Sequence, residues 1–167
     1  MKIIPAFAIL FALFSCTNPP TINGSYSATY TLRSEIANPQ NPEQTAFFLN
    51  VEQNVFYTFD EEDFSKTTSQ KFVSAEKVGD FEIDLTQEEF AKGIDNKITV
   101  NGKYSISGNK LNFVAETVTL ADGTKMDFDE YYSQNSYIGE PIYYEEFEMK
   151  NGELSISGIK YKSVQNE

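Results

Sequence analysis

The residue types that carry most catalytic chemistry are nearly absent from this sequence. Its 167 residues contain no histidine and a single cysteine, Cys16. Nucleophilic systems that use a histidine base, with either serine or cysteine, are therefore excluded. Zinc sites built on histidine or cysteine ligands are excluded for the same reason. The groups left for binding or catalysis are mainly 25 carboxylates and ten tyrosines.

Two groups of carboxylates lie close enough along the chain to raise the question of a cation site. One is the acidic tetrapeptide at 60–63, and the other contains Asp127, Asp129 and Glu130. Carboxylate oxygens are ligands that calcium prefers, but neither group has the Asp-x-Asp-x-Asp-Gly spacing that wraps an ion. An exposed, solvated turn is the simpler explanation. We predict no metal site and no cofactor.

A pair of carboxylates can hydrolyse a glycosidic bond without histidine. Glu145, Glu146 and Glu148 are available for such a pair, but their spacing does not distinguish them from the other carboxylates. A domain this small also offers little cleft for a glycan chain. The sequence therefore predicts a protein that is not an enzyme.

Tyrosines gather in one stretch of the second half, and they are the best candidates for a binding site. Tyrosine offers an apolar ring and a hydroxyl, the combination that ligand cavities and partner surfaces use. The loop at 133–141 would form the rim of a cavity. The alternative is that these are core and ordinary strand tyrosines. The candidate ligand-binding residues are Tyr131, Tyr132, Tyr137, Tyr143 and Tyr144.

Turn signals and alternating apolar residues predict the elements that would position these side chains. Asn101-Gly102, Asp122-Gly123 and Asn151-Gly152 tolerate the positive φ of tight hairpin turns. Between the turns, apolar and polar residues alternate as in half-buried strands. A shift of that alternation at Val114-Ala115 predicts a bulge. We expect β-segments at 24–34, 46–51, 54–59, 64–74, 81–85, 97–100, 103–107, 110–120, 124–132, 142–150 and 153–162.

One segment has the signature of a helix. Thr86 and Glu89 have the spacing of a capping box, in which each side chain bonds the other residue's backbone N–H. Gly93 is well placed to end the helix. The sequence predicts one short helix near residues 86–92, which connects two strands.

We expect these segments to form about eight to ten sequential strands, which favours an all-β fold, an antiparallel up-and-down β-barrel, because closure removes exposed sheet edges. Gly24-Ser25-Tyr26 opens the domain, and Tyr57-Thr58-Phe59-Asp60 leads into the acidic turn. Later, Gly102-Lys103-Tyr104-Ser105-Ile106 precedes Lys110-Leu111-Asn112-Phe113. In these motifs and their order, the chain resembles the lipocalin-like lipoproteins of bacteria. The resemblance implies a lipocalin-like barrel.

The sequence also departs from the lipocalin pattern. It contains no tryptophan, whereas lipocalins carry one in the opening motif. Its only arginine, Arg33, lies in the first predicted strand, whereas lipocalins place an arginine in the last. The resemblance therefore concerns architecture and the order of the elements.

The first residues resemble a bacterial lipoprotein signal. Lys2 precedes an apolar stretch at 3–14, which is too short to span a membrane. Leu13 and Ser15 occupy the positions −3 and −1 relative to Cys16 that the lipoprotein pattern requires, although Phe14 is bulkier than usual. The alternative is an ordinary secretory signal with an incidental cysteine. Acylation would explain why an exported chain has one unpaired thiol.

These patterns divide the chain into a signal peptide at 1–15, a lipidated tether at 16–23, a lipocalin-like barrel domain at 24–163 and a tail at 164–167. Thr17 is not the aspartate that retains some lipoproteins in the inner membrane, so the expected location is the outer membrane of a bacterial envelope. The tether at 17–23 lacks acidic residues, which favours a domain facing the periplasm over one at the cell surface.

The formal net charge of −12 argues against nucleic-acid binding, since phosphate contacts need a basic patch. The expected membrane contact is the lipid at Cys16. Two functions remain open. In the first, the barrel of an envelope lipoprotein binds a small hydrophobic or amphipathic ligand. In the second, a barrel filled by its own side chains is a structural module that binds an unidentified protein or glycan partner through its surface.

Overall fold

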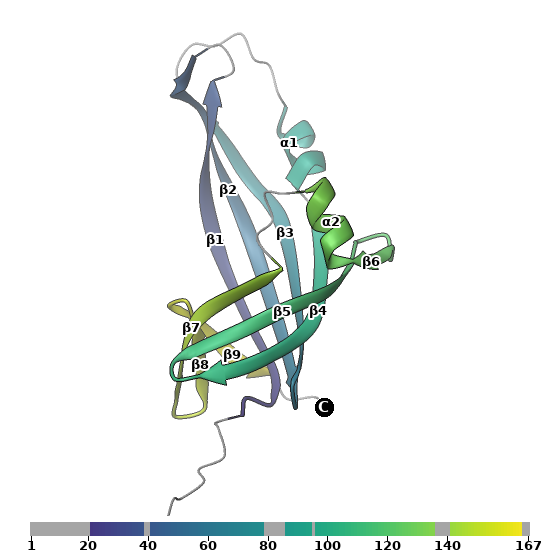
Figure 1. Ribbon diagram of the computed structural model, residues 1–167. Helices are drawn as coiled ribbons and strands as arrows, with labels where there is room; N and C mark the ends of the chain where they lie inside the picture. Colours follow the sequence, from purple (N-terminus) through teal and green to yellow (C-terminus); the bar gives the residue numbers. More distant parts are fainter. Residues whose placement is uncertain (1–20, 39–40, 79–85, 95, 136–140, 165–167) are drawn as a thin grey trace, which may run out of the picture.

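The computed structural model describes residues 21–38, 41–78, 86–94, 96–135 and 141–164. This part of the chain forms nine strands and two short helices (Figure 1). The strands are β1 (Gly24–Asn38), β2 (Asn41–Asp60), β3 (Asp63–Lys77), β4 (Asn96–Ser107), β5 (Lys110–Thr119), β6 (Lys125–Asp127), β7 (Ile142–Lys150), β8 (Glu153–Ile156) and β9 (Ile159–Val164). The helices are α1 (Gln87–Ile94) and α2 (Phe128–Gln134).

Eight strands close into a ring in the order β4-β3-β2-β1-β9-β8-β7-β5, and β5 pairs back with β4. The ninth strand, β6, pairs with the far end of β5, beyond the residues that β7 contacts. Every pairing is antiparallel, and most join strands that are consecutive in the sequence. The prediction of an all-β, antiparallel barrel-like fold with about eight to ten strands is confirmed.

One end of the barrel is filled by aromatic side chains. Tyr57 and Phe59, two residues apart on β2, both point inward and are 0% and 2% exposed. Phe59 packs edge-on against Tyr104, with ring centroids 4.9 Å apart. Ile22 is also buried, and its carbonyl accepts a hydrogen bond of 2.6 Å from the Tyr104 hydroxyl. Ile22 belongs to the segment predicted as tether, and the structure places it in the core that closes this end of the barrel.

At the other end, β1, β2 and β3 extend past the remaining strands and carry α1 (Figure 1). Phe90 of α1 packs against Phe47 and Phe72, with ring centroids 5.0 and 6.1 Å apart. The predicted capping box is present: the Thr86 N–H donates to Glu89 Oε2 at 2.8 Å, and the Glu89 N–H donates to Thr86 Oγ1 at 3.3 Å. The helix continues one residue beyond Gly93 and ends at Ile94.

The prediction that Asn101-Gly102 forms a hairpin turn is wrong. Both residues lie within β4, and the predicted strands at 97–100 and 103–107 are a single strand. A Cβ at Gly102 would lie 2.0 Å from the Val114 carbonyl oxygen, so glycine here permits β4 to approach β5 closely. The register between these strands shifts between Asn101 and Gly102, opposite Thr117 and Ala115. The bulge predicted at Val114-Ala115 therefore lies beside this glycine.

Two further segments differ from their predictions. The strand predicted at 124–132 is the short β6 followed by α2, whose buried Phe128 and Tyr131 lie three residues apart on one helix face. The strand predicted at 153–162 is two strands, because Ser157 and Gly158 adopt φ of 49° and 80° and reverse the chain.

The first half of the chain forms longer strands than its pattern predicted. The segments at 46–51 and 54–59 belong to one strand, β2, which begins at Asn41, and β1 continues beyond the predicted 24–34 to Asn38. Gln53 sits between the buried Val51 and Val55 on the inward face, so this polar residue faces the barrel interior and does not interrupt the strand. The strand predicted at 81–85 lies outside the described residues.

Candidate functional site

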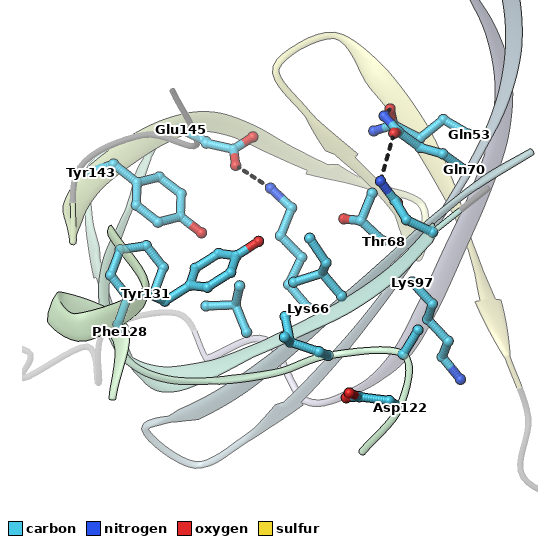
Figure 2. A pocket seen from close by; sticks show the side chains of 15 residues that line it. Gln53, Lys66, Thr68, Gln70, Lys97, Asp122, Phe128, Tyr131, Tyr143 and Glu145 are labelled. Atoms are coloured by element: carbon cyan, nitrogen blue, oxygen red, sulfur yellow. Dashed lines mark hydrogen bonds and ion pairs between the residues drawn. The ribbon is translucent and has the colours of Figure 1, made fainter. Parts of the chain in front are cut away.

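The half of the barrel away from Ile22 contains a cavity of about 940 Å³, shown in Figure 2. This volume lies within the range typical of small-molecule sites. The walls come from β2, β3, β4, β7, α2 and the connection between β5 and β6. The lining residues are Gln53, Lys66, Thr68, Gln70, Asn96, Lys97, Ile98, Val100, Leu120, Ala121, Asp122, Phe128, Tyr131, Tyr143 and Glu145.

An ion pair lies at the inner end of this cavity. Lys66 Nζ on β3 is 3.2 Å from Glu145 Oε1 on β7, and the two side chains are 26% and 20% exposed. The Tyr57 hydroxyl donates to the same carboxylate oxygen at 3.2 Å. The Ser157 hydroxyl donates to Glu145 Oε2 at 3.3 Å. The carboxylate therefore has hydrogen bonds on both oxygens, as a partly dehydrated charge requires.

Two aromatic rings flank the Lys66 ammonium. It lies 5.2 Å from the ring centroid of Tyr57 and 5.7 Å from that of Tyr143, within the range of cation–π attraction. Burial, followed by the negative charge of Glu145, raises the pKa of both tyrosines well above the ordinary value. Both phenols are therefore neutral at physiological pH, and Tyr57 remains a hydrogen-bond donor to Glu145.

Four side chains form a hydrogen-bonded row across four neighbouring strands, and we call this row the amide ladder: Asn96, Gln70, Gln53 and Tyr30. Each member is the direct register partner of the next. Asn96 Nδ2 donates to Gln70 Oε1 at 3.4 Å, and Gln70 Nε2 donates to Gln53 Oε1 at 3.2 Å. Gln53 Nε2 donates to the Tyr30 hydroxyl at 2.8 Å. The ladder gives one wall of the cavity a continuous band of amides.

The opposite wall is aromatic and aliphatic. Phe128 and Tyr131 of α2 are buried, and they pack in one cluster with Ile98, Val100 and Leu120. Figure 2 shows the rings of Tyr131 and Tyr143 on one side of Lys66 and the amides of Gln53 and Gln70 on the other. The cavity thus combines an apolar wall, an amide wall and an ion pair. This combination can hold a molecule that has both an apolar part and hydrogen-bonding groups.

The structure separates the tyrosines predicted as ligand-binding residues. Tyr131 and Tyr143 line the cavity. Tyr132 stacks on Phe128 with ring centroids 6.4 Å apart and does not line it. Tyr144 is 61% exposed on the outer face of β7, where Lys110 Nζ lies 4.2 Å from its ring centroid. Tyr137 lies outside the described residues.

The acidic candidates do not form a metal centre in the part of the chain that is described, where no cluster of three metal-ligating side chains occurs. The acidic tetrapeptide turns the chain between β2 and β3, and Asp63 pairs with Lys103 at 2.6 Å. Asp127 ends β6, and Asp129 and Glu130 are exposed in the first turn of α2.

The three glutamates considered as catalytic carboxylates are divided between the two faces of β7. Glu145 points into the cavity, whereas Glu146 and Glu148 are exposed on the outer face. This arrangement follows from the alternation of side chains along a strand. The cavity lining contains one other carboxylate, Asp122, in the β5–β6 connection at the far end of the lining in Figure 2.

Sequence reasoning missed several polar residues of the site, among them Lys66, Thr68, Gln70 and Gln53, and it considered Glu145 only as a catalytic carboxylate. The signal was present in the alternation itself. Lys66, Thr68 and Gln70 occupy the same inward phase as Phe64 and Phe72, and Glu145 lies between Tyr143 and Phe147. Polar residues at positions where the pattern calls for core residues mark an interior that is not fully packed.

No family model matches the sequence, and no curated protein matches it. Among the described residues, no helix is long and apolar enough to cross a membrane. The functional argument therefore rests on the geometry of the cavity and on the patterns of the sequence.

Proposed function

We propose that the protein is a membrane-anchored envelope lipoprotein whose barrel binds a small amphipathic ligand. The observation that carries the ligand-binding role is the cavity of about 940 Å³ with the Lys66–Glu145 pair at its inner end. Burying charged groups costs free energy that packed apolar residues avoid, so a polar interior favours a binding role over a purely structural one. The lipoprotein part of the proposal rests on the sequence around Cys16.

The anchor and the cavity would lie at opposite ends of the domain. Ile22, only six positions after Cys16, closes the aromatic end of the barrel. A fully extended segment of this length spans roughly 20 Å. In a lipidated protein the aromatic end would therefore be near the membrane, and the cavity would open away from it. Such a domain would receive its ligand from the aqueous compartment.

Two neighbouring threonines provide a matched test of ligand binding. Thr68 lines the cavity, whereas Thr67 lies on the opposite face of β3 and bonds the Thr99 hydroxyl at 2.9 Å. Thr68→Phe should place an aromatic ring in the cavity, obstruct the probe's site and abolish the fluorescence enhancement of the neutral amphipathic probe N-phenyl-1-naphthylamine. Thr67→Phe should retain it. Equal enhancement in both variants, or none with the unaltered protein, would overturn the proposed ligand binding.

Native mass spectrometry of the protein extracted from its own membranes tests the same role with the natural ligand. A bound species that Thr68→Phe loses and Thr67→Phe keeps is the expected result. A barrel that is empty in every preparation, and that does not shift on exposure to lipid or sterol probes, would contradict the proposal.

The alternative is a structural module that binds a protein or glycan partner by its surface, and one observation favours it. Val114 and Ile142 are direct register partners on the outer faces of β5 and β7, and they are 43% and 66% exposed. Tyr144 lies on the same face of β7. Crosslinking at this patch should recover a specific envelope partner, which Ile142→Lys should release. Absence of a partner would exclude this alternative.

A further inference from the structure

The amide ladder keeps hydrogen-bonding capacity that its internal bonds do not use. A primary amide has two N–H donors and an oxygen with two lone pairs. Within the ladder, Gln53 and Gln70 each donate once and accept once. Each therefore retains one donor and one acceptor position. Because both residues line the cavity, a ligand on this wall meets donors and acceptors in alternation. A hydroxyl group, which both donates and accepts, is the simplest complement.

The charges of the cavity favour an uncharged ligand. Its lining contains two basic residues, Lys66 and Lys97, and two acidic ones, Asp122 and Glu145. At the inner end, Lys66 and Glu145 neutralise each other across 3.2 Å. An anionic or cationic head group would lose its hydration and gain no net attraction from this lining. A neutral head group avoids that cost.

The wall opposite the ladder supplies an apolar surface. The rings of Phe128, Tyr131 and Tyr143 line it, and Ile98 and Val100, which follow Asn96 on the inward face of β4, add apolar lining beside the ladder. A ligand between the walls would present hydroxyl groups to the ladder and apolar C–H groups to the rings (Figure 2).

We infer that the ligand carries an uncharged, hydroxyl-rich head group of the saccharide or polyol class, and that the amide ladder selects it. This inference rests on the proposed function, since it specifies the ligand of the same cavity. The head group could reach the cavity on a lipid or as a free sugar, and both have the same hydroxyl chemistry.

Calorimetric titration with compounds that share one alkyl chain tests the inference. The probes are octyl glucoside, sodium octyl sulfate and octyltrimethylammonium, each below its micelle concentration. Octyl glucoside should bind at least about tenfold more tightly than either charged compound, which corresponds to one or two additional hydrogen bonds. Free glucose distinguishes the two sources. If glucose binds without an alkyl chain, the natural ligand is a free sugar. If only the glucoside binds, the natural ligand is a lipid that carries the sugar as its head group.

The ladder variant is Gln70→Met, which keeps the length of the side chain and removes the central amide. It should weaken octyl glucoside roughly tenfold and leave octyl sulfate unchanged. Gln87→Met on α1 makes the same substitution away from the cavity and should change neither affinity. Asn96→Leu, at the exposed end of the ladder, tests the same point if Gln70→Met does not fold.

The outcomes separate this inference from the proposed function. If all three octyl compounds bind equally and Gln70→Met has no effect, the cavity is a ligand site but the ladder does not select hydroxyl groups, and the inference is overturned. If no octyl compound and no sugar binds the unaltered protein, both the proposed ligand binding and the inference about its head group are overturned.

Discussion

Lys66 and Glu145 meet across the interior of the barrel, with Nζ and Oε1 3.2 Å apart, although 79 positions separate them in the sequence. Their strands, β3 and β7, are not neighbours in the ring. The contact therefore exists only when the barrel is closed. It also places one charge of each sign beside the cavity, so it bears on both stability and ligand binding.

Removing one member of this pair should destabilise the protein more than removing both. Lys66→Met leaves the Glu145 charge partly buried without its counter-ion, and we expect a loss of about 1–3 kcal/mol in the free energy of unfolding. The double variant Lys66→Met/Glu145→Leu should recover much of that loss. Urea denaturation measures both.

The exposed pair Lys103–Asp63 provides the control. Its side chains are 50% and 63% exposed, and Lys103→Met should change the free energy of unfolding much less than Lys66→Met does, because solvent screens an exposed pair. If Lys66→Met and Lys103→Met have the same effect, the interior pair has no special energetic role.

Gly102 should be the least replaceable glycine tested in the barrel. In Gly102→Ala the new Cβ would meet the backbone oxygen of Val114, which cannot move without opening the β4–β5 pairing. We expect a loss of about 1–3 kcal/mol. Gly93→Ala on α1 meets no atom within 4 Å and should be neutral or slightly stabilising. Thermal unfolding of both variants checks the contrast, and equal melting temperatures would refute it.

The architecture was predictable because it depends on local patterns. Alternation along β7 gave its bounds, and the Thr86–Glu89 spacing gave the helix start. The sequence could not distinguish Asn151-Gly152, which turns with φ of 53° and 81°, from Asn101-Gly102, which lies within a strand. The difference depends on the approach of β5 to β4, which is a tertiary contact.

The site was predictable only in part. Tyr131 and Tyr143 were candidates because of their residue type, but the contact between Lys66 and Glu145 depends on how the ring closes. Alternation shows that both side chains face inward. It does not show which inward residues of distant strands lie at the same level, because that depends on the register of the pairings between them.

The buried tyrosines should make the fold sensitive to alkali. Burial raises the pKa of Tyr57, Tyr143 and Tyr161 above the ordinary value of about 10, and the charge of Glu145 raises each further. A raised pKa means that the folded state holds the proton more tightly. This contribution is complete below the unfolded pKa and is lost as the pH rises toward the folded value. Tyrosinate absorbance should show these three phenols ionising together with unfolding.

Tyr143→Phe provides a simple check, because it removes one ionisable hydroxyl and keeps the aromatic ring that packs there. This variant should unfold at a higher pH than the unaltered protein. If all the tyrosines ionise at a pH lower than that of the unfolding transition, the prediction is contradicted.

The cap of α1 should weaken in acid. Hydrogen bonds from the Thr86 backbone and hydroxyl lower the pKa of the Glu89 carboxyl. A lowered pKa means that the contribution is present above the unfolded value of about 4.3 and is lost as the pH falls through the folded value. As the pH falls below the unfolded pKa and through the folded one, amide hydrogen exchange at Thr86 should therefore accelerate relative to exchange in the strands. Glu89→Gln can still cap but does not titrate, so its exchange should lack this acceleration.

Cys16 should be the sole attachment point to the membrane. Its thiol is the only one in the chain, and Leu13 and Ser15 give it the lipoprotein pattern that precedes acylation. Cys16→Ala in a bacterial host should abolish incorporation of a fatty-acid probe and release the protein from membranes, because two or more acyl chains are needed for stable retention. Ser15→Ala keeps a small residue before the cysteine and should retain both properties. Membrane association that persists in Cys16→Ala would show that another part of the chain makes the contact.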